Sequence, residues 1–412
     1  MTPQTPPAPT LPLSTHFAVP CYDGPCFARL PDLARAVFTG SPAPWAMRHE
    51  LSQIDTLVFL FVDGFGRDHF ERYQTSLSTQ GLFSDPEVFI GSSQFPSTTA
   101  AHVTTLGSGL SVGEHGIYEW YYYEPLVGEI VLPLVYSLQE TRTRDSLRSI
   151  ASPESVFPFR TLFEELDEHG VESMLLQPSN ISGSAYGSAV QRGAMLGGFS
   201  SLKRAGELLC DAVDRCDGKR RFVTLYYDEI DSAGHKFGVH SPEQDAKVRD
   251  FFTMLGGAVS GMQRKRTLFV LFADHGMTHL SPETTRYVDR ELPQFEHMLE
   301  RSKSGRVLAP CGSSRDLFLH VQPDRAEEAV ALLRRQFSEI AVTALTSDLM
   351  NAGYFGPNVS SRLRDRIGNV VVLPFEGHGV FWYGGGEFRQ HFLGNHGGLT
   401  PAELEIPIVL FS

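Results

Sequence analysis

The sequence predicts an α/β fold with a mostly parallel central sheet, helices on both faces, and a smaller α/β cap inserted late in the chain. Two observations carry this prediction. Short apolar runs alternate with helical patterns along most of the chain, as they do in sheets that are covered on both faces. From residue 291 to 390 this character changes, because none of the strand-like runs at 316–321, 340–345 and 370–373 is followed directly by a carboxylate and then Gly or His.

Length, composition and charge set the broad class. The 412 residues are 42% hydrophobic and 20% charged, which is ordinary for a globular chain with a sizeable core. Thirty-five Lys and Arg against 48 Asp and Glu leave a net charge of −13, which argues against duplex nucleic acid as a partner. No apolar run approaches the roughly 20 residues of a membrane-spanning helix, so we expect no transmembrane segment.

The chain is expected to have three parts. Residues 1–50 form an N-terminal arm and lead-in, 51–290 and 391–412 form the core, and 291–390 form the inserted cap. The first 14 residues are rich in Pro and Thr and lack a basic stretch followed by an apolar one, so they do not read as a secretory signal. Five cysteines, few and odd in number, suit a reducing compartment. We therefore expect a cytoplasmic protein.

Apolar runs predict the strands of the core. Each run is short, and three of them lead directly into an acidic segment. In chain order the runs cover residues 57–62, 174–176, 222–227, 268–273 and 406–411, the last of which closes the chain. In the cap, further runs predict strands at 316–321, 340–345 and 370–373.

Helical patterns lie between these runs. Residues 161–169 precede Gly170, a typical helix stop, and 202–216 are amphipathic. Ser241-Pro-Glu-Gln244 resembles a capping box that opens a helix to about Gly261. In the cap, residues 326–337 predict one more helix.

Three aspartates follow strands of the predicted sheet. Asp63, Asp231 and Asp274 come at or shortly after the ends of the runs at 57–62, 222–227 and 268–273. Ligands of open parallel sheets bind beyond the carboxyl ends of the strands, so these three side chains are expected to converge. One such Asp alone would read as a turn residue or a helix cap, but three together favour a site.

Histidines accompany these acids. His235 follows Asp231 by four residues, one helical turn, and His275 follows Asp274 directly. His396 lies in a glycine-rich turn before the last strand. Such a mixture of oxygen and nitrogen donors is typical of zinc, with manganese or iron as alternatives. Six donors suffice for two ions, and two ions about 3.5–4 Å apart form a clamp for in-line phosphoryl transfer.

The segment from Gln94 to Gly109 is suited to supply a nucleophile. Pro96 and the hydroxyl residues after it predict a loop that turns into a helix at about Thr99. A hydroxyl there lies beside free backbone N–H groups that can hold phosphate oxygens. The alternative is that Ser97, Thr98 and Thr99 only cap a helix.

These elements occur in a specific order. Along the chain they read Val-Asp-Gly, Phe-Pro-Ser-Thr-Thr, Gly-Glu-His-Gly-Ile, Asp-x-x-x-His, Asp-His-Gly-Met and His-Gly-Gly. The pattern resembles the alkaline phosphatase superfamily, and within it the type I phosphodiesterase/nucleotide pyrophosphatase family, from about residue 56 to 408. The resemblance implies a three-layer α/β/α alkaline-phosphatase-like core.

The resemblance also implies roles. Thr99 would be the nucleophile, since the family nucleophile is the third residue after the Pro, and it would bridge toward one metal and form a phospho-threonine intermediate. The two zinc sites would consist of Asp231, His235 and His396 for one ion, and of Asp63, Asp274, His275 and Thr99 for the other.

The chain departs from the family at one substrate contact. Where family phosphodiesterases have an Asn that binds a phosphate oxygen, this chain has Trp120, within an aromatic cluster from Tyr118 to Tyr123. Trp120 could stack on a nucleobase or pack within a strand. His102 is a second candidate for substrate binding, with a plain helix-face role as the alternative, and Ala100, next to the nucleophile, is a third.

Together these residues predict a two-metal phosphodiesterase or nucleotide pyrophosphatase, which hydrolyses phosphodiester or phosphoanhydride bonds of a small phosphorylated substrate such as a nucleotide. A phosphomonoesterase or phosphonate hydrolase would use the same site, because the discriminating contacts lie in the cap and the aromatic cluster. A non-catalytic protein that binds metal or phosphate is the third alternative.

Overall fold

The larger part of the molecule is built on one seven-stranded sheet in the order β2-β17-β9-β1-β8-β6-β7. The computed structural model describes residues 13–79, 85–215, 218–262 and 266–412. Strand β1 pairs in parallel with β8 and β9, and β6 pairs in parallel with β7 and β8. Strand β17 runs against both of its neighbours, β9 and β2. The mostly parallel sheet is therefore confirmed.

Burial explains which strands the sequence indicated. Every residue of β1 and β9, in the middle of the sheet, is buried, so these strands read as continuous apolar runs. The edge strands β2 and β7 are largely half-buried or exposed, and no apolar run indicated them. The strands are β1 Thr56–Val62, β2 Glu87–Ser92, β6 Val171–Pro178, β7 Ala194–Phe199, β8 Arg220–Tyr227, β9 Thr267–Phe272 and β17 Glu405–Phe411.

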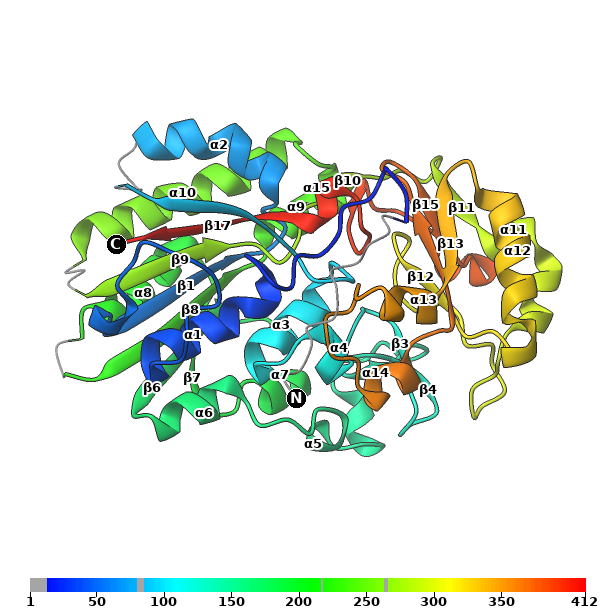
Figure 1. The fold of residues 1–412 in the computed structure, drawn as a ribbon, viewed down its shortest axis with the longest axis horizontal. Coiled ribbons are helices and arrows are strands. Elements are labelled where there is room, and N and C mark those ends of the chain that lie inside the picture. Colours follow the sequence, from blue (N-terminus) through cyan, green and yellow to red (C-terminus); the bar gives the residue numbers. More distant parts are fainter. Residues whose placement is uncertain (1–12, 80–84, 216–217, 263–265) are drawn as a thin grey trace, which may run out of the picture.

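Helices cover both faces of this sheet and make the three layers that the sequence predicted (Figure 1). One face carries α2 Arg67–Thr79, α8 Leu202–Val213, α9 Glu229–Phe237 and α10 Pro242–Gly261. The other face carries α1 Leu30–Thr39, α3 Thr99–Ser108, α6 Leu162–Glu168 and α7 Ala185–Val190.

Two helix ends differ from the prediction. Helix α8 ends at Val213, short of the predicted 216, which itself lies outside the described residues. At the start of α10, Ser241 Oγ accepts from the Gln244 N–H, but Gln244 Oε1 accepts from His240 N–H instead of completing a capping box. A complete box does occur at α6, between Thr161 and Glu164.

The smaller part of the molecule lies at the other end in Figure 1. Its antiparallel sheet has the order β12-β14-β13, and α12 packs against it. The predicted strands and helix are all present there, as β12 Leu317–Leu319, α12 Ala326–Phe337, β13 Ala341–Leu345 and β14 Val370–Pro374. The short strands β11 Thr285–Tyr287 and β15 Gly379–Phe381 pair beside them.

The aromatic segment around residue 120 joins the two parts. It runs into a three-stranded sheet of β3 Tyr122–Glu124, β4 Glu129–Leu132 and β5 Ser137–Leu138. Tyr118 and Tyr122 belong to one hydrophobic cluster with Phe318 and Val371 of the smaller sheet. Short elements complete the described chain: α4 Val112–His115, α5 Pro153–Val156, β10 Thr278–His279, α11 Val288–Glu291, α13 Thr346–Asn351, α14 Ser361–Arg366, β16 Gly394–Asn395 and α15 Pro401–Leu404.

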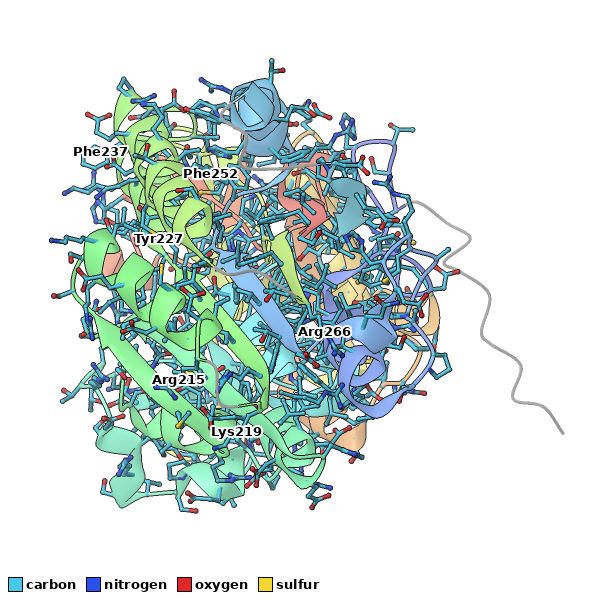
Figure 2. All side chains as sticks on the ribbon, turned by 90° about the vertical axis from the view of Figure 1, so that its left-hand side faces the viewer. Arg215, Lys219, Tyr227, Phe237, Phe252 and Arg266 are labelled. Carbon is cyan, nitrogen blue, oxygen red and sulfur yellow. The ribbon has the colours of Figure 1, made fainter. Side chains whose placement is uncertain are left out.

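The carboxyl ends of the parallel strands face the smaller part of the molecule (Figure 1). The opposite end, where β8 and β9 begin, faces the viewer in Figure 2 and carries Arg215, Lys219 and Arg266. Among the described residues, we find no helix that combines the length and the apolar character needed to cross a membrane.

Candidate active site

Three aspartates meet at the carboxyl edge of the sheet. Asp63 follows β1, Asp274 comes two residues after β9, and Asp231 lies in the first turn of α9, which follows β8. Because β1 pairs with both β8 and β9, the three segments are neighbours. Gly64, at a φ of +71°, permits the close approach, since a Cβ at this position would lie 3.0 Å from the Asp231 Cα.

The three predicted histidines point their Nε2 atoms at these acids. His235 Nε2 lies 3.3 Å from Asp231 Oδ2, and His275 Nε2 lies 3.3 Å from Asp274 Oδ2 and 3.4 Å from Asp63 Oδ1. His396 Nε2 lies 3.6 Å from Asp231 Oδ1. His396 reaches the site because β16 pairs with β10, which follows His275 closely in the chain. All six predicted metal ligands therefore lie in one cluster.

Backbone carbonyls hold each histidine in the orientation of a metal ligand. His235 Nδ1 donates to Gly394 O at 2.8 Å, His275 Nδ1 to Gly276 O at 3.0 Å, and His396 Nδ1 to Ser97 O at 2.9 Å. A carbonyl can only accept, so the proton lies on Nδ1 and the Nε2 lone pair faces the acids. This is the tautomer that histidine ligands adopt when their second nitrogen is anchored.

Within the described part of the chain, two groups of three side chains have ligand atoms that lie within 4.8 Å of one another. One group is Asp63, Asp274 and His275, the set expected for one ion. The other is Asp231 and His396 with His275, where His235 was expected as the third member. The His235 ring lies 5.1 Å from the His396 ring and beside Asp231, so it adjoins this second group. His275 lies between the two groups.

The buried carboxylates of this cluster need added positive charge to remain ionised. Burial, followed by the charges of Asp274 and Asp231, raises the pKa of Asp63 well above its usual range. Burial and the Asp231 charge raise the pKa of Asp274 to about 7. Asp231 Oδ1 and Asp274 Oδ2 are buried without a hydrogen-bond partner among the described residues. Buried acids of this kind are compensated by metal ions, so the donor set fits divalent cations.

Thr99 carries the hydroxyl that lies on this donor cluster. It is the first residue of α3, and its Oγ1 lies 3.4 Å from each carboxylate oxygen of Asp63 and 3.2 Å from His275 Nε2. The two preceding hydroxyls have other surroundings. Ser97 Oγ donates to Gly398 O at 2.8 Å, and Thr98, the N-cap of α3, lies beside the Glu119 carboxyl.

The three predicted substrate contacts have different fates. Trp120 is 39% exposed and lines a cavity together with Thr99. Ala100 is buried in the first turn of α3, with 1% of its surface exposed, so its side chain offers no contact to a ligand. His102 is fully buried, with Nδ1 at 2.6 Å from Thr98 O and Nε2 at 2.8 Å from Ser93 Oγ. Both ring nitrogens are engaged, so His102 is the helix-face residue of the alternative interpretation and not a phosphate donor.

Two side chains of the site, Tyr226 and Ser313, were not predicted from the sequence. Tyr226, the last but one residue of β8, donates its hydroxyl to Asp63 Oδ2. Ser313, in the smaller part of the molecule, donates to Asp316 Oδ1 at 2.6 Å and lies 3.2 Å from His396 O. The position of Tyr226 at the carboxyl end of a central strand could have pointed to it. Ser313 is 83 residues from His396, and no local pattern relates the two.

Comparison with known proteins agrees with this geometry. Residues 57–399 match the family model described as type I phosphodiesterase / nucleotide pyrophosphatase. The chain belongs to this family. The description of this family names hydrolases, the enzyme class that the resemblance implied.

A curated relative is an uncharacterised pyrophosphatase/phosphodiesterase of Schizosaccharomyces pombe. It is 22% identical over 244 residues, which are 57% of this chain and 47% of that protein. The chain thus spans about half the length of this relative of the phosphodiesterase family.

Solved structures share the fold. Murine ectonucleotide pyrophosphatase/phosphodiesterase 5 has a TM-score of 0.63 at 16% identity, over 86% of this chain and 87% of that chain. Its inactive threonine-to-alanine variant in complex with AMP has the same TM-score at 17% identity, over 87% and 88% of the two chains. The human protein has a TM-score of 0.63 at 15% identity, over 86% and 87%. The phosphodiesterase-family fold is therefore common to all of them.

Proposed function

We propose that the protein hydrolyses phosphodiester or phosphoanhydride bonds at a two-metal site, with Thr99 as the nucleophile. The observation that carries the proposal is the position of Thr99 Oγ1, 3.4 Å from the Asp63 carboxylate and 3.2 Å from His275 Nε2, within the cluster of metal donors. An ordinary helix cap would not need to lie against two such donors.

The donors divide between two divalent ions. Asp63, Asp274 and His275 would hold one ion, together with Thr99. Asp231, His235 and His396 would hold the other. Zinc suits this mixture of carboxylates and imidazoles best, with manganese or iron as alternatives. Such ions supply the positive charge that stabilises the attacking and leaving oxygens of an in-line displacement.

The residues of the chain then have defined tasks. Thr99 Oγ1 attacks phosphorus after losing its proton, for which the Asp63 oxygens are acceptors within reach. A P–O bond to Thr99 forms while the bond to the leaving oxygen breaks, and the leaving group departs as an alcohol or a phosphate. Backbone N–H groups in the first turn of α3 hold the phosphate oxygens. Water then cleaves the phospho-threonine and restores the hydroxyl.

The relatives support a phosphorylated small molecule as substrate. AMP is bound in one solved structure of the murine protein, whose threonine-to-alanine variant is inactive. We therefore keep a nucleotide among the candidate substrates. Trp120, in place of the Asn expected to bind a phosphate oxygen, favours phosphomonoester or phosphonate hydrolysis as the second candidate.

The test compares bis-p-nitrophenyl phosphate with p-nitrophenyl phosphate, on protein whose metal content is measured before and after zinc is added. We expect about two metal ions per chain and faster turnover of the diester. Faster turnover of the monoester would move the function to the second candidate. Bound metal without turnover of either substrate would favour the non-catalytic alternative.

Two variants test the choice of nucleophile. Thr99→Ala is expected to abolish turnover while metal binding survives. Thr98→Ala is the matched control, because it removes the neighbouring hydroxyl, which lies beside Glu119, and it is expected to retain most of the turnover. Near wild-type turnover in Thr99→Ala would refute the assignment.

A further inference from the structure

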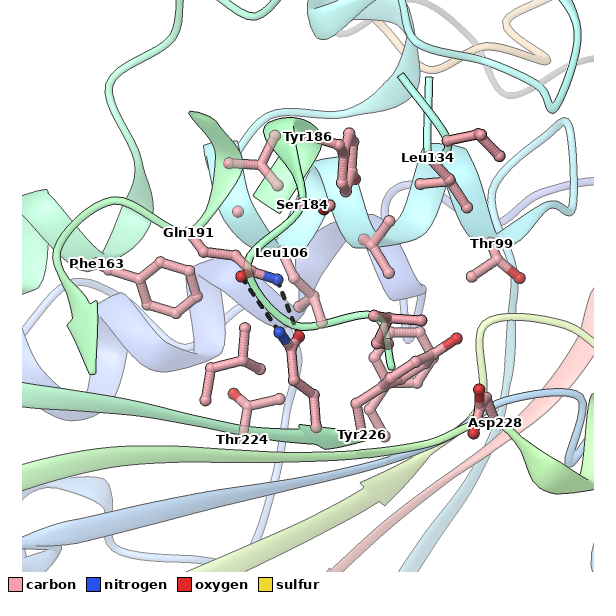
Figure 3. A pocket seen from close by; sticks show the side chains of 18 of the residues that line it. Thr99, Leu106, Leu134, Phe163, Ser184, Tyr186, Gln191, Thr224, Tyr226 and Asp228 are labelled. Carbon is pink, nitrogen blue, oxygen red and sulfur yellow. Dashed lines mark hydrogen bonds between the residues drawn. The ribbon is translucent and has the colours of Figure 1, made fainter. Parts of the chain in front are cut away.

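A cavity of about 300 Å³ extends from Thr99 into the interior between α3 and the sheet (Figure 3). Thr99 lies at one side of the view and Phe163 of α6 at the other, with Tyr226 and Leu106 between them. The cavity is therefore elongated, and one end of it adjoins the proposed nucleophile.

The helix that carries the nucleophile also forms one wall. Thr99, Val103 and Leu106 are spaced by four and three residues, so they lie on one face of α3. Strands β6 and β8 contribute Leu175 and Phe222 to the facing wall. Any group that enters the cavity from a phosphate bound at Thr99 therefore meets mostly aliphatic and aromatic carbon.

Most of the polar side chains of the wall have partners within the protein. Gln177 and Gln191 face each other, with the Gln191 amide donating to Gln177 at 3.0 Å (Figure 3). The Tyr186 hydroxyl lies 3.1 Å from Thr104 Oγ1. The Arg144 guanidinium donates to backbone carbonyls of residues 180, 181 and 182.

A nucleobase would bring several donors and acceptors into these surroundings. Because most polar side chains of the wall are already engaged, most of these donors and acceptors would lose water without gaining an equivalent partner. An apolar chain has no such cost and gains free energy from every carbon that it buries. The lining therefore favours hydrocarbon over a base.

We propose that this cavity receives an aliphatic chain joined through oxygen to the scissile phosphate, so that the substrates are phosphoesters of aliphatic alcohols. The proposal rests on the proposed function, because it places that chain next to Thr99. A cavity of about 150 Å³ holds benzene, so twice that volume has room for roughly ten carbon atoms. Trp120 and Ile181, which are 39% and 36% exposed, line the cavity where it meets solvent.

A series of alkyl p-nitrophenyl phosphodiesters, from methyl to dodecyl, tests the proposal against the p-nitrophenyl ester of thymidine 5′-phosphate. Burial of one methylene corresponds to about a fourfold gain, so we expect kcat/KM to rise by about that factor per carbon and to level off near ten carbons. The octyl ester should be turned over faster than the thymidine ester. A flat dependence on chain length, or a faster thymidine ester, would overturn the proposal and leave the proposed function intact.

Binding provides a readout that does not need turnover. Decyl phosphate should bind the Thr99→Ala variant far more tightly than methyl phosphate does, measured by calorimetry below the concentration at which micelles form. If no ester is turned over but decyl phosphate binds far more tightly than methyl phosphate, the proposed function is wrong, while the proposal that the cavity binds an aliphatic chain is supported. Equal affinities for the two phosphates would overturn the proposal that the cavity binds an aliphatic chain.

A pair of variants locates the chain. Leu175→Phe extends a ring into the cavity and should shorten the best substrate by several carbons. Leu196→Phe is the matched control, since Leu196 pairs with Leu175 across β6 and β7, is 45% exposed, and lies outside the cavity lining. It should leave the chain-length profile unchanged. The same profile for both variants would refute the location.

Discussion

The buried ion pair between Arg315 and Glu403 offers the sharpest test of how the smaller part of the molecule supports the site. Both side chains are fully buried, and they meet through two bonds, Nε to Oε1 at 2.9 Å and Nη2 to Oε2 at 2.8 Å. Arg315 also donates to the carbonyls of Pro374, Phe375 and His378. Arg315→Met would remove all of these bonds and leave the Glu403 carboxylate buried without its cation.

The expected loss of unfolding free energy is large for a single substitution. Removing one partner of a buried ion pair costs about 3–5 kcal/mol, because the remaining charge is uncompensated. With an unfolding entropy of about 2.1 cal/mol/K per residue, 412 residues give about 0.9 kcal/mol/K. The melting temperature should therefore fall by about 3–6 °C.

Arg315→Met should also weaken metal binding by the donor residues. Glu403 accepts the N–H of Gly398 at 3.1 Å, two residues after His396. When Arg315 no longer orients this carboxylate, the loop of His396 loses one of its anchors. Weaker retention of metal during dialysis is therefore expected alongside the lower stability.

Scanning calorimetry and urea denaturation on metal-free protein measure the melting temperature and the free energy of unfolding without the contribution of bound metal. Arg325→Met is the control, because Arg325 pairs with Glu328 on the surface, and no measurable change is expected there. The double variant Arg315→Met/Glu403→Gln should recover part of the loss, since no buried charge is then left unpaired. An Arg315→Met protein as stable as the Arg325→Met control would refute the reasoning.

Two further predictions concern the metal donors and a buried acid. His396→Ala should lower the zinc content of purified protein, and full occupancy by two ions would contradict its role. Burial raises the pKa of Glu119 to about 7, and this acid lies against the buried Asp316. Because the folded-state pKa exceeds the ordinary value of 4.5, the folded form binds this proton more tightly, and stability should decline as pH rises from about 4.5 to 7. The melting temperature of Glu119→Gln should therefore decline less between pH 5 and 8 than that of the wild-type protein. Equal declines in the two proteins would exclude Glu119 as the source of the pH dependence.

Local patterns in the sequence determined the core of the fold. Strands such as β1 and β9 are buried on both faces, so their composition alone marks them as strands. The acids that follow central strands must then meet, because the carboxyl ends of parallel strands lie on one edge of the sheet. This is why Asp63, Asp231 and Asp274 could be expected to converge before any contact was known, whereas their division between two ions came from the family resemblance. The proposal of Thr99 as the nucleophile came from its place in the Phe-Pro-Ser-Thr-Thr motif.

Other features depended on contacts between distant segments. The edge strands β2 and β7 are exposed on part of their surface, so their apolar content is too low to mark them. His102 lies one turn from Thr99, yet its two ring nitrogens are engaged by Ser93 Oγ and Thr98 O. A residue's position on a helix sets which face it occupies, but the neighbours decide whether its polar atoms remain free.

Only the tertiary structure determined which residues surround the Thr99 hydroxyl. Arg315 and Glu403 are 88 residues apart, and their pairing follows from how the smaller part of the molecule docks on the core. The cavity beside Thr99 has walls from α3, β6 and β8, three segments spread over more than a hundred residues. The sequence determined which carboxylates, imidazoles and hydroxyls the chain offers to the proposed site, because those groups follow from residue type and local spacing. The shape of the space next to them arises only when distant surfaces pack together.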